Sequence, residues 1–546
     1  MVFTSKRKVE PIPQLDLLSF LFDGPSSLAK EDTVLHAEAA NPNNFITKAQ
    51  ARVLTRRIAY VLRNRFGIGE NGSGEDIVVV MSTGQIMLPI LFMAIIAAGG
   101  VASLASPSFR PEELARQIQQ GSAKLCISCA ATEDILLAAS RLTNTPSHRC
   151  LVLESTAPWR LRLLTSSSRI NIVGNEELEW KRITSRKELD DSLICLLYSS
   201  GTTGPPKGVM MSHTNMVSLP TMTSVSLRET WQKEGKYDYR TLAHLPTAHV
   251  AGVLGYFCLP FHNGGVTYWM PKFDFLDFLK YNEQLKITTF FSVPPIYLLL
   301  VKSPMVKNQF KALRHATAGA APMGKDLQSA ACSKLGVTIA QTWGLSETSG
   351  SVTLGDINVQ DPSGSVGLIL PRMELRIVDD DGKECAPNTP GEILVRGPTI
   401  SNGYYNNPAA NAETFQDGFL CTGDIGYFQN DRLYIVDRKK ELIKYKGLQI
   451  APAELEATLL SHPRILDAGV VGVYSTELAT EVPRAYVVAD PKVISAEEIQ
   501  AFIKGRLASY KQLRGGVVFI PAIPKLPSGK ILRKDLRMLA AGKAKL

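Results

Sequence analysis

Hydrophobic positions along the chain fall into short uninterrupted runs separated by longer amphipathic segments. Residues 77–81 form a β-branched apolar run, residues 85–98 are apolar over a length that suits a helix, and residues 101–104 are apolar again. The amphipathic residues 111–120 then precede another apolar run at 125–128. Runs that are apolar on both faces and alternate with helical segments are typical of parallel strands joined by crossover helices. We therefore expect an α/β fold with parallel sheets through much of the first four hundred residues.

The same region carries no charged residue between Asp76 and Arg110. Its length alone allows a transmembrane helix. The turn residues 82–84 (Ser-Thr-Gly) and the pair at 99–100 (Gly-Gly) interrupt the stretch, however, and indicate a strand, a helix and a second strand. We therefore expect these residues inside a protein core, with no transmembrane segment.

The pattern of hydrophobic and turn residues changes at about residue 373. Short strand-like runs at 374–379, 391–396, 418–424 and 432–436 are separated by turn residues, which predicts a small β-rich subdomain. Beyond residues 446–447 the pattern predicts helices at 453–460 and 496–507. The same stretch predicts strands at 468–474, 484–488 and 516–519. The predicted fold is thus a large N-terminal domain (residues 1–439, β-rich from about 373) and a small α+β C-terminal domain (residues 440–546).

Composition agrees with a globular protein, because 45% of the 546 residues are apolar. The net charge of +9 is local, since residues 504–546 hold eleven lysines and arginines against one acid, Asp535. A basic nucleic-acid-binding protein is one reading of this tract. Such a surface would interleave aromatic side chains with the charges, and residues 506–546 contain only Tyr510 and Phe519. We therefore expect no nucleic-acid partner.

The eight cysteines are scattered singly except for the pair Cys126 and Cys129. No second pair is present that could complete a zinc site, and the pair lies in an apolar run, so both are expected to be buried structural residues. A disulfide framework is not indicated, which favours a reducing compartment. The N-terminal residues include Lys6, Arg7 and Lys8 but no long apolar segment follows, so we expect no secretory signal.

The strongest chemical signal is a loop of hydroxyl-bearing residues and glycines closed by a lysine. Residues 196–208 read Leu-Leu-Tyr-Ser-Ser-Gly-Thr-Thr-Gly-Pro-Pro-Lys-Gly. A strand that runs into such a loop offers backbone and side-chain donors and one positive charge to a polyphosphate. The spacing differs from the P-loop of nucleoside triphosphatases, because Gly208 follows Lys207 where that motif has Ser or Thr. We interpret the segment as a phosphate-binding loop.

Further motifs follow in a fixed order. Residues 341–348 read Gln-Thr-Trp-Gly-Leu-Ser-Glu-Thr, residues 420–424 Leu-Cys-Thr-Gly-Asp and residues 436–440 Val-Asp-Arg-Lys-Lys. Tyr405, residues 444–456 and the Pro-Ser-Gly-Lys at 527–530 complete the set. With the loop, they resemble the adenylate-forming superfamily of acyl-CoA synthetases, luciferases and peptide-synthetase adenylation domains. The resemblance covers nearly the whole chain and is closest to the 4-coumarate-CoA-ligase-like acyl-CoA ligases.

The resemblance implies a nucleotide site that uses ATP and Mg²⁺. Glu347 and Thr202 would ligate the metal, Ser346 would contact phosphate, and Asp424 and Arg438 would hold the ribose. Trp343 stands where the family commonly has Tyr. The other implied nucleotide-contacting residues are Ser199, Ser200, Gly201, Thr203, Gly204, Lys207, Gly319, Ala320, Ala321, Pro322, Gln341, Thr342 and Gly344.

The resemblance also implies a C-terminal domain that works in two states. Lys530 would bridge the acyl carboxylate and the α-phosphate, where a positive charge lowers the repulsion between two anions. Its basic neighbours Arg533, Lys534 and Arg537 are expected on a solvated face. Lys440 would be the hinge about which the domain rotates. In the second state coenzyme A would meet Lys446, together with Lys444, Gly447 and Gln449.

His249 matches the histidine that lines the acyl pocket of the family. Ala248 beside it offers no hydrogen-bonding side chain, so we expect an open, apolar pocket. The implied activity is that of an acid–thiol ligase. It would activate a largely apolar carboxylic acid, fatty, aryl or arylpropenoic, as acyl-AMP and transfer it to coenzyme A, releasing AMP and pyrophosphate.

Two alternatives within the family remain open from sequence. One is a luciferase-like oxygenase, and the other is a stand-alone adenylating enzyme that does not use coenzyme A. A module that feeds a carrier protein is not expected, given the short sequence after Lys530. The final residues Ala544, Lys545 and Leu546 resemble the Ser-Lys-Leu address read by the peroxisomal import receptor. We therefore expect a peroxisomal enzyme, cytoplasmic if that signal is not read; the oligomeric state stays open.

Overall fold

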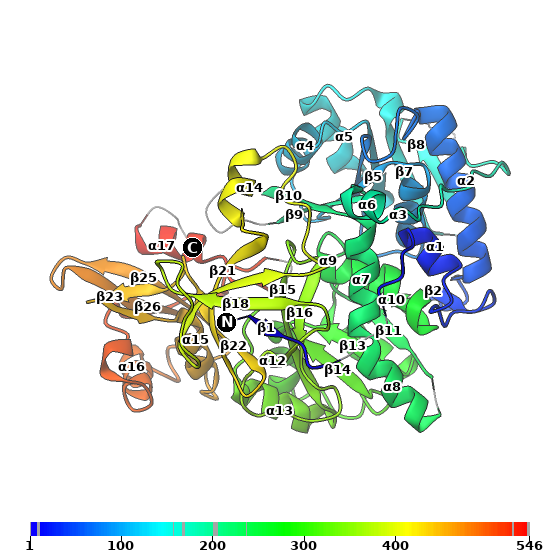
Figure 1. The fold of residues 1–546 in the computed structure, drawn as a ribbon. Helices are drawn as coiled ribbons and strands as arrows, with labels where there is room; N and C mark the ends of the chain where they lie inside the picture. Colours follow the sequence, from blue (N-terminus) through cyan, green and yellow to red (C-terminus); the bar gives the residue numbers. More distant parts are fainter. Residues whose placement is uncertain are drawn as a thin grey trace.

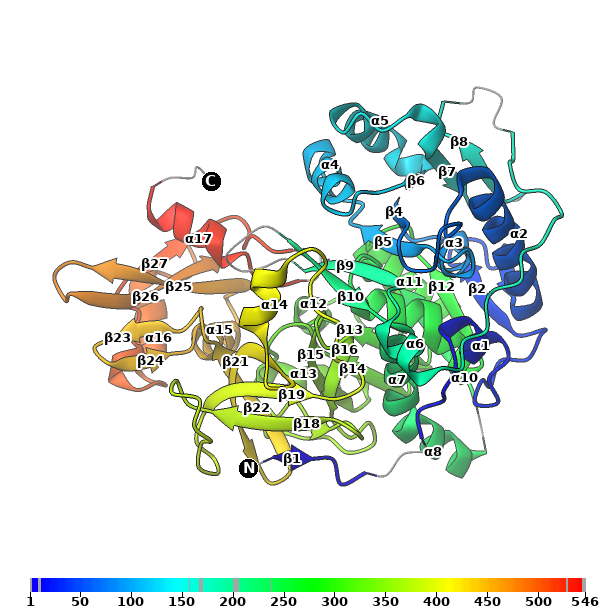
Figure 2. The same cartoon turned by 45° about the horizontal axis from the view of Figure 1, so that its top comes forward.

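The computed structural model describes residues 2–7, 11–156, 158–165, 170–199, 206–235, 237–526 and 529–542. In Figure 1 the N-terminal helices lie on one side of the molecule and the orange-to-red C-terminal segments lie on the other. The same separation is seen after rotation in Figure 2. Between them lie the sheets and strands that carry the sequence motifs.

A 7-stranded sheet forms the first layer, in the order β10-β9-β5-β4-β6-β7-β8. The strands β9, β5, β4, β6 and β7 run parallel, and β10 and β8 close the two edges antiparallel. Its strands are β4 (Ile77–Met81), β5 (Val101–Ala105), β6 (Leu125–Cys129), β7 (Cys150–Glu154), β8 (Arg160–Leu163), β9 (Cys195–Ser199) and β10 (Lys207–Met211). The associated helices are α2 (Lys48–Phe66), α3 (Met87–Ala97), α4 (Pro111–Gln120), α5 (Glu133–Leu142) and α6 (Arg186–Asp191).

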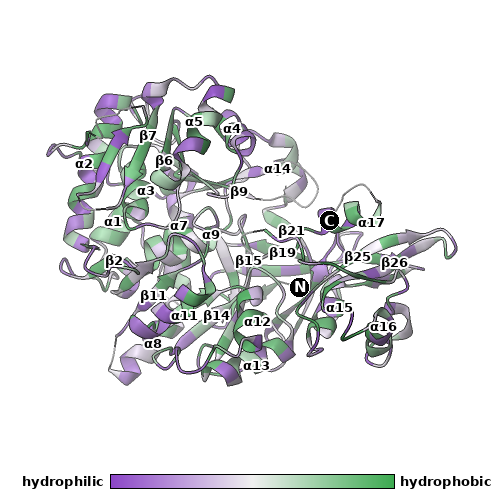
Figure 3. Ribbon diagram, turned by 180° about the vertical axis from the view of Figure 1, so that it is seen from behind, coloured by the Kyte–Doolittle hydropathy of each residue, from purple (hydrophilic) through white to green (hydrophobic). Residues whose placement is uncertain are grey.

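The uncharged residues 77–109 contain strand β4, helix α3 and strand β5, as predicted. All 11 residues of α3 are buried, and the helix packs against α2 and the strands β5 and β7. Figure 3 colours this helix and the strands beside it mainly as hydrophobic. None of the helices in the described ranges is both long enough and apolar enough to cross a membrane. Cys126 and Cys129 are both buried, which confirms the expectation for this pair.

The middle of the N-terminal domain holds a 4-stranded and a 5-stranded sheet. The first contains β2 (Val34–Glu38), β3 (Phe45–Thr47), β11 (Arg240–Ala243) and β12 (Val266–Trp269). The second contains β13 (Thr289–Ser292), β14 (His315–Ala318), β15 (Ile339–Leu345), β16 (Gly350–Leu354) and β17 (Leu368–Ile369). The helices here are α1 (Leu17–Phe22), α7 (His213–Thr223), α8 (Val225–Glu234), α9 (Val250–Gly252), the π-helical segment Val253–Cys258, α10 (Leu259–Asn263), α11 (Phe275–Gln284), α12 (Pro294–Lys302) and α13 (Lys325–Leu335).

Part of this region is antiparallel, beside the parallel strands that the sequence predicted. β15, β16 and β17 pair antiparallel, and so do β2 and β3. The reason is the length of the connection, because β15 and β16 are joined by a short turn from Ser346 to Ser349. A parallel pair needs a crossover of a dozen or more residues.

The β-rich subdomain predicted from about residue 373 is a 6-stranded antiparallel sheet. It contains β18 (Glu374–Val378), β19 (Gly391–Arg396), β20 (Phe415–Gln416), β21 (Phe419–Gln429) and β22 (Arg432–Arg438), with α14 (Pro408–Thr414) beside it. β21 is longer than predicted because it continues into a hairpin with β22 through Asn430 and Asp431. The N-terminal strand β1 (Phe3–Thr4) pairs with β18.

The C-terminal domain contains a hairpin of β23 (Ile443–Tyr445) and β24 (Leu448–Ile450) and a 3-stranded sheet. The sheet consists of β25 (Asp467–Ser475), β26 (Thr480–Val488) and β27 (Val517–Phe519), with helices α15 (Pro452–Leu460), α16 (Ala496–Lys504) and α17 (Arg533–Ala540). Two predicted bounds are wrong. The predicted strand at 484–488 begins at Thr480 because it pairs with β25 along its whole length, and the helix predicted to end at 507 ends at Lys504, before Gly505.

Candidate active site

The predicted phosphate-binding loop lies at the end of the β9–β10 hairpin. Ser199 and Lys207 face each other across this hairpin and mark the two ends of the loop. Ser200, Gly201, Thr202, Thr203 and Gly204 lie outside the described residues. The Lys207 ammonium nitrogen is 4.7 Å from the centre of the Tyr404 ring. The charge that closes the loop is therefore held against an aromatic face.

Tyr404 connects the loop hairpin to the predicted metal ligand. Its hydroxyl donates a hydrogen bond to Glu347 Oε1 at 2.9 Å, and its side chain is buried. Burial and the Glu347 charge both raise the pKa of Tyr404. The neighbouring Tyr405, which carries the sequence motif, instead donates its backbone N–H to the Gly208 carbonyl. Sequence reasoning missed Tyr404 because two adjacent tyrosines give no sign of which one faces inward.

The predicted ribose-binding pair is assembled across the β21–β22 hairpin. Asp424 and Arg438 are direct neighbours in the register of the two strands, and Arg438 Nε lies 3.0 Å from Asp424 Oδ1. The second carboxylate oxygen, Oδ2, accepts a hydrogen bond from the Trp343 indole N–H at 2.8 Å. Asp424 is 4% exposed. Trp343 thus contacts the carboxylate that the resemblance assigns to the ribose.

The remaining residues of the 341–348 motif lie at the end of β15. Gln341 directs its amide to Gln328 on α13, at 2.9 Å, and to the Met323 carbonyl, at 3.3 Å. The Thr342 hydroxyl bonds the Thr353 carbonyl. Gly344 sits at a β-bulge, where an added Cβ would lie 1.8 Å from the Gly350 carbonyl oxygen. Ser346 accepts a backbone bond from Ser349 in the turn that follows.

The predicted small-residue loop, Gly319 to Pro322, follows β14 directly. A Cβ at Gly319 would lie 2.8 Å from the Thr342 methyl group, so the two segments are in close contact. Ala320 has a φ of +68°, a left-handed conformation that is uncommon for a residue other than glycine. Strained backbone of this kind persists where the surroundings enforce it and clusters at functional sites.

Lys530 reaches this site from the C-terminal domain. A Cβ at Gly529 would lie 3.0 Å from the Pro295 ring at the start of α12, which places the loop against the N-terminal domain. Burial and the nearby Arg438 lower the pKa of Lys530 to about 8, against the opposing influence of Asp424 and Glu441. Lys530 thus shares the electrostatic environment of the predicted ribose pair.

The expectation that Arg533 lies on a solvated face is wrong. Its guanidinium makes two bonds to Glu456 on α15, at 2.8 Å and 2.7 Å, and its side chain is 11% exposed. Arg537 pairs with Glu441 at 2.8 Å. Burial raises the pKa of Glu456 to about 7, while Arg533 lowers it. These pairs anchor α17, and with it the loop that carries Lys530, to the rest of the C-terminal domain.

The predicted acyl-pocket residues lie in the middle of the N-terminal domain. His249 is the residue before α9, and burial lowers its pKa, so the imidazole is neutral at neutral pH. The imidazole makes no hydrogen bond with any described residue, whereas the backbone of His249 bonds Pro246, Gly252 and Val253. Ala248 is buried. Leu254, two residues after α9, and Leu219 on α7 lie against Gly350, where a Cβ would be 3.5 Å and 2.6 Å from their side chains.

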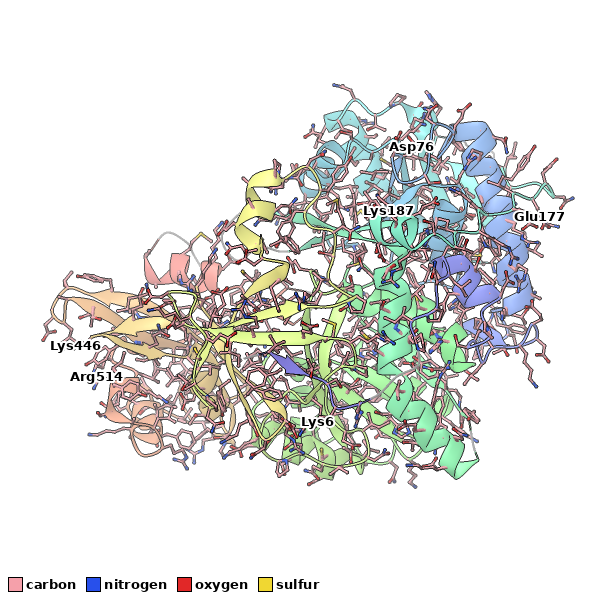
Figure 4. The ribbon with its side chains drawn as sticks, in the orientation of Figure 1. Lys6, Asp76, Glu177, Lys187, Lys446 and Arg514 are labelled. Atoms are coloured by element: carbon pink, nitrogen blue, oxygen red, sulfur yellow. The ribbon has the colours of Figure 1, made fainter. Side chains whose placement is uncertain are left out.

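The predicted coenzyme A residues lie elsewhere. Lys446 and Gly447 form the turn of the β23–β24 hairpin, with φ values of +46° and +80°. Lys444, Lys446, Gly447 and Gln449 are all exposed. Figure 4 labels Lys446 near Arg514 at the outer end of the C-terminal domain, away from the sheets of the N-terminal domain. The structure thus brings Lys530 to the other site residues and leaves Lys446 apart from them.

Comparisons with known proteins agree with this arrangement. The AMP-binding enzyme family matches residues 29–405, and its C-terminal domain matches residues 454–530. The chain belongs to the AMP-binding enzyme family. A protein of Emericella nidulans named as an acyl-coenzyme A synthetase is 46% identical over 98% of this chain and 97% of its own length. A phenylacetyl-CoA ligase of Aspergillus niger is 34% identical over 98% of both chains.

A solved structure supports the same conclusion. ATP-bound MatB from Rhodopseudomonas palustris has a TM-score of 0.80 and 26% identity, covering 96% of this chain and 98% of its own. The protein is thus an ATP-dependent acid–CoA ligase of the AMP-binding family. In the first half-reaction a carboxylate oxygen bonds to the α-phosphorus of ATP and pyrophosphate leaves. In the second, the thiol of coenzyme A bonds to the acyl carbon and AMP leaves.

The lowered pKa of Lys530 predicts a pH dependence for the first half-reaction of this ligase. A pKa of about 8, against 10.5 for an ordinary lysine, means that the positive charge is lost as the pH rises through about 8. We therefore expect kcat/KM for ATP in adenylate formation, which reports groups of the free enzyme, to fall above about pH 8. The residual activity of Lys530→Ala should lack this fall. A wild-type profile that stays level up to pH 10.5 would contradict the assignment.

Proposed function

We propose that this ligase activates a largely apolar carboxylic acid at the site formed by Lys207, Glu347, Asp424, Arg438 and Lys530. The single observation that carries the proposal is that Lys530, on a C-terminal loop packed against Pro295, lies within electrostatic reach of Asp424 and Arg438 of the N-terminal domain. A cation at this point can face the carboxylate and the α-phosphate together and reduce their repulsion. The domain arrangement thus suits adenylate formation.

Glu347 fits the magnesium ion that the family resemblance implies. Tyr404 occupies Glu347 Oε1, and Oε2 has no hydrogen bond to any described residue, so it remains open to a ligand. Mg²⁺ prefers oxygen ligands and is commonly held by one or two carboxylates together with substrate phosphates. Bound there, it would neutralise charge on the phosphates during adenylate formation. Thr202, the second proposed ligand, lies in the loop outside the described residues.

Apolar acids are proposed because the described residues of the acyl region offer few polar groups. Ala248 is buried without a polar side chain, His249 is neutral, and Leu219 and Leu254 pack at Gly350. The similarity to a phenylacetyl-CoA ligase supports an aryl acid as one member of this class. A hydroxyl group buried without a partner costs roughly 1–3 kcal/mol, which is a factor of about five to 150 in binding.

A panel of acids tests this proposal through pyrophosphate release. Fatty, aryl and arylpropenoic acids are each compared with a hydroxylated counterpart of the same length, at saturating ATP. We expect higher kcat/KM for the apolar member of every pair, because only that ratio reports differential transition-state binding. A preference of about tenfold or more, about 1.4 kcal/mol, for the hydroxylated acids would refute the apolar assignment.

Peroxisomal localisation is proposed from the C-terminal residues Ala544, Lys545 and Leu546, which lie outside the described part of the chain. Their similarity to a Ser-Lys-Leu address is the support for this proposal. A fluorescent protein fused to the N-terminus should give peroxisomal puncta, and deletion of these three residues should move the fusion to the cytosol. Activity in vitro should not change, because chain termini contribute little packing. Puncta that persist after the deletion would exclude this signal.

A further inference from the structure

Trp343 places its one polar atom against the carboxylate of Asp424. Its side chain is 8% exposed, and the indole nitrogen lies 2.8 Å from Asp424 Oδ2. Trp343 is on β15 of the 5-stranded sheet, and Asp424 is on β21 of the antiparallel sheet. The bond therefore ties together two sheets that meet at the site.

The two oxygens of Asp424 differ: Oδ2 accepts the indole hydrogen bond, whereas the buried Oδ1 accepts no hydrogen bond from a described residue. Arg438 contacts Oδ1 with a flexible side chain that is 34% exposed, whereas the indole that holds Oδ2 is rigid and buried. A carboxylate accepts at about four lone-pair positions, so the one hydrogen-bond donor leaves room for further donors. With Oδ2 held by the indole and Oδ1 paired with Arg438 by charge alone, the carboxylate is held in one orientation in which Oδ1 can accept a hydrogen bond from a ligand.

We propose that Trp343 is a positioning residue for nucleotide recognition: its indole N–H orients Asp424 so that the free lone pairs of the carboxylate receive the ribose hydroxyls of ATP. The inference rests on the proposed role of Asp424 in ribose binding. A group fixed before the ligand arrives loses less entropy on binding and recognises the ligand more strongly.

The test compares ATP with 2′-deoxy-ATP and 3′-deoxy-ATP in pyrophosphate release by the full-length protein. Trp343→Phe removes the indole N–H and retains an aromatic ring. We expect it to raise the KM for ATP by about fivefold or more, with a smaller change in kcat, and to leave the KM for at least one deoxynucleotide close to wild type. The preference of the enzyme for ATP over that deoxynucleotide should fall by the same factor.

Trp231→Phe on α8 is the matched control. It removes the same atoms from a fully buried tryptophan whose indole N–H bonds no described residue, so the nucleotide preference should stay at the wild-type value. Asp424→Ala is the benchmark and should abolish the preference for a ribose hydroxyl. If Trp343→Phe does not fold, as judged by its thermal melt, Trp343→Leu, which also lacks a hydrogen-bond donor, is measured in its place with the same expected loss of preference.

The outcomes distinguish the ribose-binding role of Asp424 from the positioning role of Trp343. An Asp424→Ala variant that keeps the wild-type preference would overturn the ribose role of Asp424, and with it this inference. Loss of preference in Asp424→Ala but not in the Trp343 variant would overturn the inference alone. Equal losses by the Trp343 variant with all three nucleotides would also overturn it, because that result describes a packing role.

Discussion

Lys530→Ala is expected to lower the rate of acyl-adenylate formation by about 10²–10³-fold and to leave acylation of coenzyme A from preformed acyl-adenylate close to wild type. This is the range expected when one preorganised group that stabilises developing charge is removed. The charge is needed while two anions approach each other, and the need ends once the new P–O bond exists. The two half-reactions are measured separately, by pyrophosphate release and by acyl-CoA formation.

The neighbouring Lys534 provides the control for this prediction. It is an exposed lysine on α17, four residues from Lys530 in sequence, and makes no ion pair with a described residue. Lys534→Ala changes the net charge of the same basic segment equally, so it should leave both half-reactions unchanged. If Lys530→Ala slowed both half-reactions by the same factor, the lysine would have no special role in adenylation.

The α/β core was predictable from sequence because its signal is local. The run at 77–81 is apolar on both faces, and the structure has β4 at those residues with β5 and β6 on its two sides. By contrast, β1 is only two residues long and forms because it pairs with β18 near residue 374. No periodicity marks so short a strand. The antiparallel direction of β16 follows from the short connection between β15 and β16. The hydrophobic pattern did not show where β15 ends and β16 begins, so this length could not be predicted.

The site was predictable as a set of motifs and not as a set of contacts. Family resemblance pointed to Asp424 and Arg438, and strand register explains why they meet. The bond from Trp343 to Asp424 joins residues on two sheets, and nothing in either motif specifies it. Likewise, Arg533 was expected in solvent from its basic neighbours. Its burial follows from the packing of α17 against Glu456 on α15, which is a tertiary contact.

The hydrogen bonds around residues 438–442 favour Lys440 as the point about which the C-terminal domain turns. Lys439 belongs to the N-terminal domain, because its N–H bonds the Gly423 carbonyl and its ammonium pairs with Asp380 and Glu392. The Glu441 side chain pairs with Arg537 of the C-terminal domain, while its backbone N–H closes a turn with the Arg438 carbonyl. Lys440 lies between these two anchored residues and is exposed. A rotation that brings Lys446 to the site would therefore be absorbed at this residue.

Lys440→Pro is expected to leave adenylate formation within about twofold of wild type and to slow coenzyme A acylation from preformed acyl-adenylate by about a hundredfold, which corresponds to about 2.7 kcal/mol of barrier. Proline holds φ near −65° and resists the dihedral change that the second state requires. In the present domain arrangement, two features of Lys440 are compatible with a proline at this position. The backbone N–H of Lys440 donates no hydrogen bond to a described residue, and its φ is not positive.

Lys440→Ala separates the backbone effect from loss of the lysine charge. Alanine keeps both dihedrals free, so this variant should carry out both half-reactions at rates near wild type. The contrast between proline and alanine at one position then isolates the rotation itself, since the two differ mainly in the freedom of φ and in the N–H group. If Lys440→Pro made acyl-CoA from preformed adenylate as fast as Lys440→Ala, the domain would turn about a different residue.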